Sequence, residues 1–277
     1  PIGGGGQNEG QTEIEADGIN TTLESAVETA GEGIPTVIRL TDDAKVSETV
    51  VIPEDKKIIL DLNGYSITAA AGFSGRVFEN HGYLRIEGGG TIDISAAGRK
   101  GYGTADNYGC LEVEDGSYIS LKETFTSNFY NRKGGKAVFY APDMEAGAGC
   151  IKSQEGSETY IYGGKYSSEI YSAVENNGYM EITGGEFIDT SCARCSFQPG
   201  YTIQSGEDSE SASLLVKGSE DDSVNVCGFY GALSIKGGTA DIYNGVYSTM
   251  DCDKGHGEAY YAAYFKGNGS GNKVNIY

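Results

Sequence analysis

The sequence "GYMEITGGEF" at residues 178–187 nearly repeats "GYLRIEGGGT" at residues 82–91. In both phrases apolar residues alternate with polar ones before a Gly-Gly pair, which is the pattern of a strand with one buried face followed by a turn. The same template returns at residues 159–166, 233–240 and 240–247. This recurrence predicts a solenoid, because one such unit buries its apolar face only against stacked neighbours.

A second repeat lies upstream of the first in two of the copies. "VFENHGYL" at residues 77–84 matches "AVENNGYM" at residues 173–180, with Asn80 and Asn176 in equivalent places. Two matching phrases define a coil of short strands joined by an Asn-containing turn and a Gly-Gly bend, repeated at roughly 20 to 40 residues. Equivalent residues are expected to form ladders along the solenoid axis.

The N-terminal region predicts a cap and a tether. Residues 21–30, "TTLESAVETA", carry a Thr-x-x-Glu capping box and apolar residues at helical spacing, which predicts a short capping helix. Residues 1–18 are Gly-rich and acidic, as in a flexible tether, with a frayed terminus as the alternative. The predicted fold is an all-β, single-stranded right-handed parallel β-helix over residues 19–277.

The composition limits the partners. Among 277 residues, 40 are acidic and 20 are basic, so the formal net charge is -20. Such a chain repels phosphate backbones, and a nucleic-acid partner is therefore not expected. No stretch approaches the roughly 20 apolar residues of a membrane helix, so membrane insertion is not expected either. Six cysteines, an even number, suit an oxidising exterior.

These features together resemble a known class of proteins. Residues 21–40 and 50–68, followed by Glu-Asn-x-Gly and Gly-Gly coils, resemble bacterial right-handed parallel β-helix surface proteins of the pectate-lyase-like superfamily. The resemblance implies a secreted, cell-surface protein of the adhesin-like or polysaccharide-binding kind. It does not imply one activity, because a fold hosts many functions.

Three residues near the C-terminus are candidates for catalysis. Polygalacturonase-type hydrolases are similar in placing an Asp-Asp pair, here Asp221 and Asp222, before Gly-His-Gly, here around His256. One carboxylic acid would protonate the leaving oxygen while another carboxylate activates water. The family's Asn-x-Asp and Arg-x-Lys motifs are missing from this sequence, and a solvated loop is the alternative for all three residues.

Metal sites are suggested by two further groups. Asp251, Asp253 and Glu258 share a Gly-rich loop whose carboxylates could hold Ca²⁺, although a complete calcium-loop pattern is missing. A lyase of the same superfamily would need such an ion to neutralise a uronate. Cys192 and Cys195 have the spacing of half a zinc knuckle, without the second Cys-x-x-Cys that a strong zinc motif requires.

One disulfide is suggested by position. Cys110 and Cys150 each follow a glycine at the same place in their phrases, so their side chains would stack within disulfide range if the two coils were neighbours. Two free thiols are the alternative.

Four tyrosines are candidates for ligand binding. Tyr83 and Tyr179 follow the turn glycine, whereas Tyr162 and Tyr243 follow the inward Ile, and all four are expected to point outward on two ladders. An exposed tyrosine has an apolar face and a polar tip, which suits stacking on a sugar or contact with a protein. The alternative is that aromatic pairs between coils only stabilise the solenoid.

A different tyrosine position is expected inside. Tyr166, Phe187 and Tyr247 share the third place of the template and should pack inward. The function expected from all these features is a non-catalytic extracellular binding or adhesion module for polysaccharide or for a host or cell-surface protein. A polysaccharide lyase or glycoside hydrolase, and a structural stalk, are the alternatives.

Overall fold

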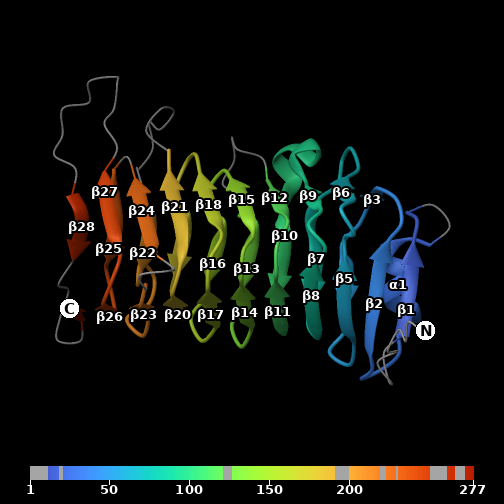
Figure 1. Ribbon diagram of the computed structural model, residues 1–277, viewed down its shortest axis with the longest axis horizontal. Coiled ribbons are helices and arrows are strands. Elements are labelled where there is room, and N and C mark those ends of the chain that lie inside the picture. The colour runs from blue at the N-terminus through green and yellow to red at the C-terminus, as the bar shows by residue number, and fades with distance from the viewer. Residues whose placement is uncertain are drawn as a thin grey trace, which may run out of the picture.

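A computed structural model of the chain describes residues 12–18, 21–120, 127–190, 200–218, 223–228, 230–249, 261–265 and 272–277. The chain winds into a parallel β-solenoid, whose strands lie side by side from the N-terminal to the C-terminal end (Figure 1). Except at the N-terminal end of the largest sheet, strands that are neighbours in a sheet are three strands apart in the chain, because each coil contributes one strand to each of three sheets. The predicted all-β solenoid is confirmed.

The three sheets are named here sheets 1, 2 and 3, and every strand pairing within them is parallel. Sheet 1 has 11 strands: β1 (Thr12–Ala16), β2 (Pro35–Leu40), β5 (Lys57–Asp61), β8 (Tyr83–Glu87), β11 (Cys110–Val113), β14 (Lys136–Phe139), β17 (Glu158–Ile161), β20 (Tyr179–Ile182), β23 (Ser213–Val216), β26 (Thr239–Ile242) and β29 (Lys273–Ile276). Sheet 2 has nine: β4 (Val50–Ile52), β7 (Gly75–Asn80), β10 (Gly101–Asn107), β13 (Phe129–Asn131), β16 (Ile151–Ser153), β19 (Val174–Asn176), β22 (Ile203–Ser205), β25 (Gly231–Ile235) and β28 (Tyr261–Phe265). Sheet 3 has nine: β3 (Ala44–Val46), β6 (Ser66–Ala69), β9 (Thr91–Asp93), β12 (Ser117–Ile119), β15 (Asp143–Ala146), β18 (Lys165–Ser168), β21 (Gly185–Asp189), β24 (Val224–Gly228) and β27 (Val246–Thr249).

The phrase at residues 178–187 forms β20, the turn after it and the start of β21. Met180 and Ile182 point into the core, whereas Tyr179 and Glu181 lie on the outer face of sheet 1. The inward ladder that contains Met180 also contains Leu84, Leu111, Ala137 and Thr159. The first copy of the phrase, in β8, therefore occupies the same place four coils earlier, and the prediction that the phrase repeats because the coil repeats is confirmed.

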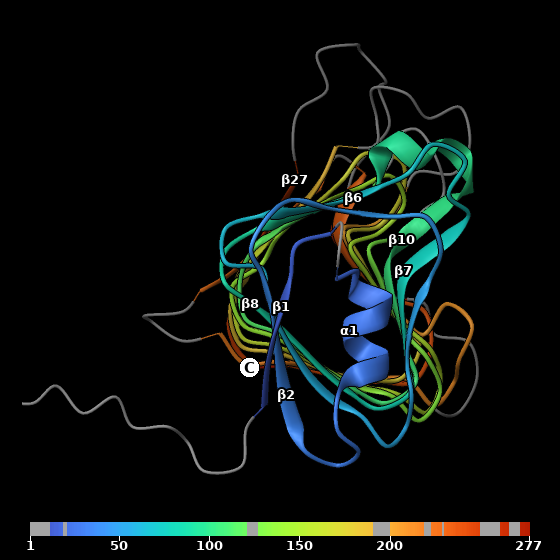
Figure 2. The same ribbon diagram turned by 90° about the vertical axis from the view of Figure 1, so that its right-hand side faces the viewer.

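A short helix closes the N-terminal end. Helix α1 (Leu23–Thr29) lies across the opening of the first coil and buries its apolar residues against the solenoid core (Figure 2). The predicted capping helix is confirmed, but its N-cap is Thr22, whose hydroxyl accepts a hydrogen bond from the Ser25 backbone N–H. The expected box from Thr21 to Glu24 is wrong by one residue. A 3-10 helix, η1 (Ser95–Lys100), leads from β9 to β10.

The predicted boundary of the tether is also wrong. Residues 12–16 form β1, which pairs in parallel with β2 and adds a strand to the end of sheet 1. Ile14 and Ala16 pack against the core, so this acidic segment still has the alternation of a half-buried strand. The solenoid therefore begins before residue 18, and residues 1–11 lie outside the described part of the chain.

A ladder of buried asparagines runs along the inside of sheet 2. Asn80 donates a hydrogen bond from Nδ2 to Asn107 Oδ1 over 2.7 Å, and Asn107 Nδ2 donates to Asn131 Oδ1 over 2.8 Å. Asn176 lies farther along the same ladder and donates to Ser205 Oγ over 3.0 Å. Buried amides need such partners, so the turns after these strands are held by side-chain bonds between coils. The predicted equivalence of Asn80 and Asn176 is confirmed.

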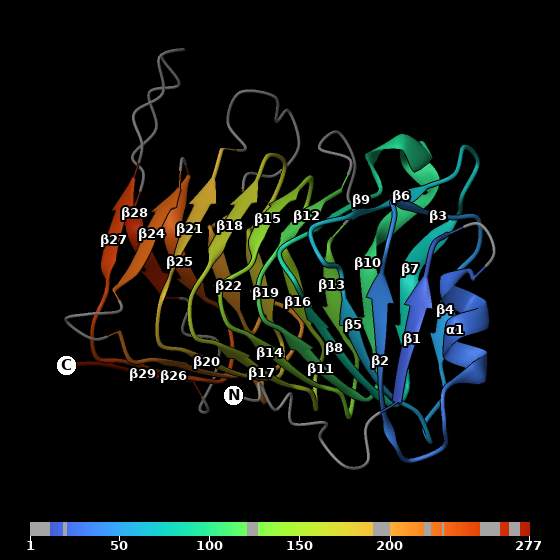
Figure 3. The same cartoon turned by 45° about the vertical axis from the view of Figure 1, so that its right-hand side comes forward.

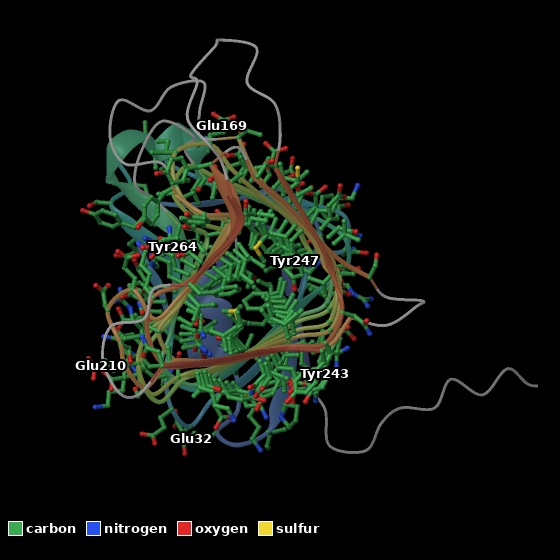
Figure 4. All side chains as sticks on the ribbon, turned by 90° about the vertical axis from the view of Figure 1, so that its left-hand side faces the viewer. Glu32, Glu169, Glu210, Tyr243, Tyr247 and Tyr264 are labelled. Carbon is green, nitrogen blue, oxygen red and sulfur yellow. The ribbon has the colours of Figure 1, made fainter. Side chains whose placement is uncertain are left out.

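An aromatic stack fills part of the interior behind sheet 3. Tyr166 and Phe187 are 1% and 0% exposed, and their rings stack with centroids 4.8 Å apart and planes 7° apart. Tyr247 follows on the same ladder, partly buried, and lies on the inner side of its sheet in the view from the C-terminal end (Figure 4). The prediction that these three residues point inward is confirmed.

The architecture leaves three broad outer faces, one for each sheet, and one helix-capped end (Figure 3). Within the described ranges, no helix has both the length and the apolar character that crossing a bilayer requires. Function must therefore be sought first on the outer faces, where side chains from successive coils are held in register.

Candidate functional site

The candidate catalytic and metal-binding residues lie in segments outside the described residues. These are Asp221, Asp222, His256, Asp251, Asp253 and Glu258, together with Cys192 and Cys195. They stay predictions. In the part of the chain that the structure does describe, no group of three or more His, Cys, Asp or Glu side chains is placed to hold a metal ion.

The proposed pairing of Cys110 with Cys150 is wrong. Cys110 begins β11 on the outer face of sheet 1, whereas Cys150 directly precedes β16 of sheet 2 and points into the core. Both are free thiols. Cys150 lies 3.3 Å from the Ser167 carbonyl oxygen, and burial raises the pKa of its thiol. The prediction failed because the glycine before each cysteine leads into a strand of a different sheet, sheet 1 for Cys110 and sheet 2 for Cys150.

The four candidate tyrosines are all on the outer face of sheet 1. Tyr83 and Tyr179 share the ladder that leads through Cys110, Lys136 and Glu158. Tyr162 and Tyr243 directly follow β17 and β26, and they are 43% and 44% exposed. Their outward orientation and their arrangement on two ladders are confirmed.

Two further tyrosines join the outer face between the predicted ones. Tyr140 directly follows β14, and Tyr160 lies in the middle of β17. Together with Tyr162 and Tyr179 they form a diagonal row across three neighbouring strands, in the order Tyr140, Tyr162, Tyr160, Tyr179. This row is called the tyrosine strip below.

The rings of the strip form two contacting pairs. The Tyr140 and Tyr162 centroids are 5.4 Å apart, and the Tyr160 and Tyr179 centroids are 5.8 Å apart. Tyr160 and Tyr162 are two residues apart on one strand and therefore share its outer face. Val138 lies beside Tyr160 on the same face and is only 8% exposed, because neighbouring side chains cover it. The strip therefore places two aromatic pairs on one face, with the covered side chain of Val138 beside them.

Glutamates accept hydrogen bonds from the tyrosine hydroxyls. Tyr160 donates to Glu158 Oε2 over 3.1 Å, and Tyr179 donates to Glu181 Oε2 over 3.0 Å. Partial burial and the bond to Glu181 raise the pKa of Tyr179 to about 12. These bonds fix the ring orientations, since a tyrosine has only two side-chain torsions to restrain.

A fifth tyrosine lies two strands before the strip. Burial and a hydrogen bond to Glu112 raise the pKa of Tyr83 to about 12. Glu112 also acts electrostatically on Tyr140, the first residue of the strip, and raises the pKa of that phenol together with burial. Tyr83 is therefore linked to the strip through a shared carboxylate.

Some of the charged side chains around the strip form ion pairs and others do not. Arg85 forms ion pairs with Glu87 at 2.8 Å and Glu114 at 3.3 Å, and Lys217 forms one with Glu181 at 3.0 Å. Within the described ranges, Glu112 and Glu158 form no ion pair. Glu112 accepts a hydrogen bond from the Tyr83 hydroxyl, and Glu158 accepts one from the Tyr160 hydroxyl. The Lys136 ammonium lies 5.1 Å from the centroid of the Tyr160 ring, which is a cation–π geometry.

A second pair of tyrosines lies at the C-terminal end of the same face. Tyr243 and Tyr277 stack with centroids 4.4 Å apart and planes 5° apart. Tyr243 lies on the outer side of sheet 1 in the end-on view (Figure 4). The ladder that contains Tyr140 and Tyr162 thus carries tyrosine again farther along the solenoid, with Lys217 between the two groups.

Sheet 2 carries a charged cluster of a different kind. Arg76 is 8% exposed, pairs with Asp106 at 2.8 Å and donates to the Ser127 carbonyl oxygen over 2.6 Å. Burial lowers the pKa of Arg76 to about 10. Arg132 completes the pairing of Asp106 at 2.9 Å. These groups satisfy one another inside the wall, so the cluster holds the β7–β13 region together and offers little to a ligand.

Tyr140 and Tyr160 had signals in the sequence. "AVFY" at residues 137–140 has the same alternation as "TYIY" at residues 159–162, with Phe in place of the inward Ile. Tyr160 occupies an outward place between two inward residues of its strand. Reading outward positions coil by coil, instead of matching the quoted template, would have found both.

No protein family, curated protein or solved structure matches the chain. The interpretation of the site therefore depends on the geometry and chemistry of its own residues.

Proposed function

We propose that the protein is a non-catalytic extracellular binding module for polysaccharide, and that the tyrosine strip is its binding surface. The observation that carries this proposal is the presence of two contacting pairs of tyrosine rings, from three successive coils, on one outer face. Single exposed apolar residues are ordinary on protein surfaces, whereas a contiguous aromatic patch with a polar rim is typical of an interaction site.

The strip has the chemical properties that a glycan requires. The ring faces of Tyr140 and Tyr162 present apolar surface, and these two side chains are 38% and 43% exposed. A sugar ring has an apolar face of similar size and hydroxyl groups at its edge. The carboxylates beside the rings can accept hydrogen bonds from those hydroxyls, and charge-assisted bonds of this kind are the stronger ones.

The scaffold presents the strip in a rigid form. The strands under it are paired in parallel register on both sides, and the coil turns are bonded to one another by the buried asparagines. A surface that is ordered before binding loses little conformational entropy when the ligand arrives. This favours a repetitive, extended ligand such as a polysaccharide chain.

The setting of the protein is part of the same proposal. The resemblance to bacterial surface proteins of the pectate-lyase-like superfamily, with the Gly-rich residues before β1 as a tether, supports a secreted, cell-surface location. The parallel solenoid agrees with that resemblance, and a fold alone carries no activity.

Binding to a panel of soluble polysaccharides, measured by calorimetry, tests the proposal. Tyr140→Ala combined with Tyr162→Ala should weaken binding of the active glycan about tenfold or more, because buried aromatic anchors carry most of the energy of an interface. Tyr102→Ala is the matched control, since Tyr102 is 53% exposed but lies on sheet 2. Equal binding by both variants would assign the glycan to another surface.

The natural cysteines locate the ligand independently. Cys110 lies on the outer face of sheet 1 between Tyr83 and Lys136, and Cys227 lies half-buried on the outer face of sheet 3. A glycan on the strip should slow alkylation of Cys110, followed by mass spectrometry of the peptides, and leave the rate at Cys227 unchanged. Release of new reducing ends or unsaturated uronates in the same mixtures would overturn the non-catalytic assignment.

A further inference from the structure

Two carboxylates beside the strip bond to tyrosine hydroxyls instead of forming close ion pairs. Within the described part of the chain, Glu112 and Glu158 have tyrosine hydroxyls as partners and form no ion pair. Both act on rings of the strip: burial raises the pKa of Tyr140 and of Tyr160, and Glu112 and Glu158 respectively add to the shift. A ligand that lies on these rings therefore meets two carboxylates whose nearest cations, Arg85 beside Glu112 and Lys136 beside Glu158, lie on neighbouring strands.

The strip already accepts one ammonium group from the protein itself. Lys136 Nζ lies 5.1 Å from the Tyr160 ring centroid, and Lys136 and Glu158 are direct partners across β14 and β17. The face of a tyrosine ring attracts a cation, and the attraction grows where the site is partly desolvated. The contact shows that the face of the Tyr160 ring is placed to receive an ammonium group as well as an apolar surface.

The charge of the whole chain acts in the same direction. A formal net charge of -20 attracts a cationic polymer and repels a polyuronate at long range. A lysine- or arginine-rich protein would also be attracted by this charge. A glycan fits the strip better, because sugar rings use the apolar faces of Tyr140 and Tyr162 while their substituents meet the carboxylates.

We infer that the tyrosine strip selects an amine-bearing glycan, one whose sugar rings stack on the tyrosines while its ammonium groups approach Glu112 and Glu158. This inference depends on the proposed polysaccharide-binding function and names the class of ligand. It separates the protein from binders of uronate polymers, whose carboxylates would face Glu112 and Glu158 directly.

Two hexasaccharides with one backbone test the inference. The β-1,4-linked hexamer of glucosamine and its fully N-acetylated form differ in charge at the nitrogen and in the added acetyl group. At mildly acidic pH and low salt, calorimetry should show about fivefold to tenfold tighter binding of the glucosamine hexamer, as two weak surface ion pairs would give. The difference should shrink as salt screens the charges.

Variants assign the preference to the two carboxylates. Glu112→Gln combined with Glu158→Gln keeps acceptors for the tyrosine hydroxyls and removes two charges. It should bring the two hexamers to nearly equal affinity, mainly by weakening binding of the glucosamine hexamer, while the acetylated hexamer loses less because the glutamine amide oxygens still accept bonds from sugar hydroxyls. Glu48→Gln combined with Glu186→Gln is the control, because both residues are exposed, lie away from sheet 1 and change the net charge equally.

The outcomes separate this inference from the proposed function. Equal affinity of the native protein for both hexamers would overturn the amine preference and keep the strip as a site for neutral glycans. Failure of both hexamers and of the whole polysaccharide panel would overturn both proposals. Binding of the glucosamine hexamer that survives Tyr140→Ala combined with Tyr162→Ala would identify general attraction to an acidic protein, which also overturns the inference.

Discussion

Two aromatic pairs in this solenoid have similar spacing and opposite surroundings. Tyr166 and Phe187, inside sheet 3, have ring centroids 4.8 Å apart and almost no exposure. Tyr140 and Tyr162, outside sheet 1, have centroids 5.4 Å apart and are 38% and 43% exposed. Each pair joins adjacent coils at equivalent positions, so the coil repeat alone explains both distances.

The difference between the pairs lies in what surrounds each ring. The hydroxyl of Tyr166 donates to the Gly163 carbonyl oxygen over 2.7 Å, so even its polar tip is satisfied within the protein. The outer rings have carboxylates and solvent around them. A ladder of aromatic residues therefore stabilises the solenoid where it faces inward, and outside it contributes mainly a surface for contact.

The largest expected effect is on the inner pair. Phe187→Ala should lower the free energy of unfolding by about 3–5 kcal/mol, because it removes a fully buried ring and leaves a cavity beside Tyr166. Urea or guanidinium unfolding, followed by circular dichroism, measures the change. A loss below about 1 kcal/mol would mean that the coils collapse around the site, and the contrast between inner and outer ladders would fail.

The asparagine ladder extends the comparison to polar side chains. Asn107→Ala should cost about 2–3 kcal/mol, because it leaves Asn131 Oδ1 without its inter-coil donor and removes one of the two inter-coil acceptors of the Asn80 side-chain amide inside the wall. Asn225, exposed on the outer face of β24, is the matched control, and Asn225→Ala should change the stability by less than about 0.5 kcal/mol. Similar losses in both variants would show that the ladder has no special role.

High pH should destabilise the folded protein through the buried Tyr166. Burial raises the pKa of Tyr166, so its phenol stays protonated in the folded protein after the unfolded chain has begun to ionise. Its contribution to stability is complete below the unfolded value of about 10 and decreases as the pH rises beyond it. Tyr166→Phe removes that dependence, and it should move the midpoint of alkaline unfolding to higher pH.

The matched outer variant sharpens this test. Tyr160 keeps contact with solvent, and although burial and Glu158 also raise its pKa, Tyr160→Phe should move the alkaline midpoint less than Tyr166→Phe does. The midpoints can be followed by fluorescence or circular dichroism at fixed salt. A larger shift for the outer variant would contradict the assignment of the alkaline sensitivity to the interior.

Much of the interior followed from the sequence. Alternation in "MEI" and "LRI" identified the inward residues Met180, Ile182, Leu84 and Ile86, because burial on one face of a strand imposes a period of two. The match between Asn80 and Asn176 identified the amide ladder. These inferences worked because the core tolerates few residue types at each inward position.

The outer face was harder to read, since solvent-facing positions accept many residues. Tyr83, Tyr162, Tyr179 and Tyr243 were found where the quoted phrase repeats, whereas Tyr140 lies in a coil whose phrase has changed. The wrong pairing of Cys110 with Cys150 shows a related limit of local sequence matches. A local match to a turn glycine does not say which of the three sheets the next strand joins, and that depends on the number of residues in each turn.

The smallest expected effect on stability belongs to the strip. Tyr162→Ala should change the free energy of unfolding by less than about 1 kcal/mol, because the ring is 43% exposed and its loss leaves no internal cavity. The same variant should weaken glycan binding clearly, so the two measurements separate a contact surface from a structural stack. If Tyr162→Ala lowered the free energy of unfolding as much as Phe187→Ala does, the outer ladder would be structural, and the proposal that the strip is a binding surface would fail.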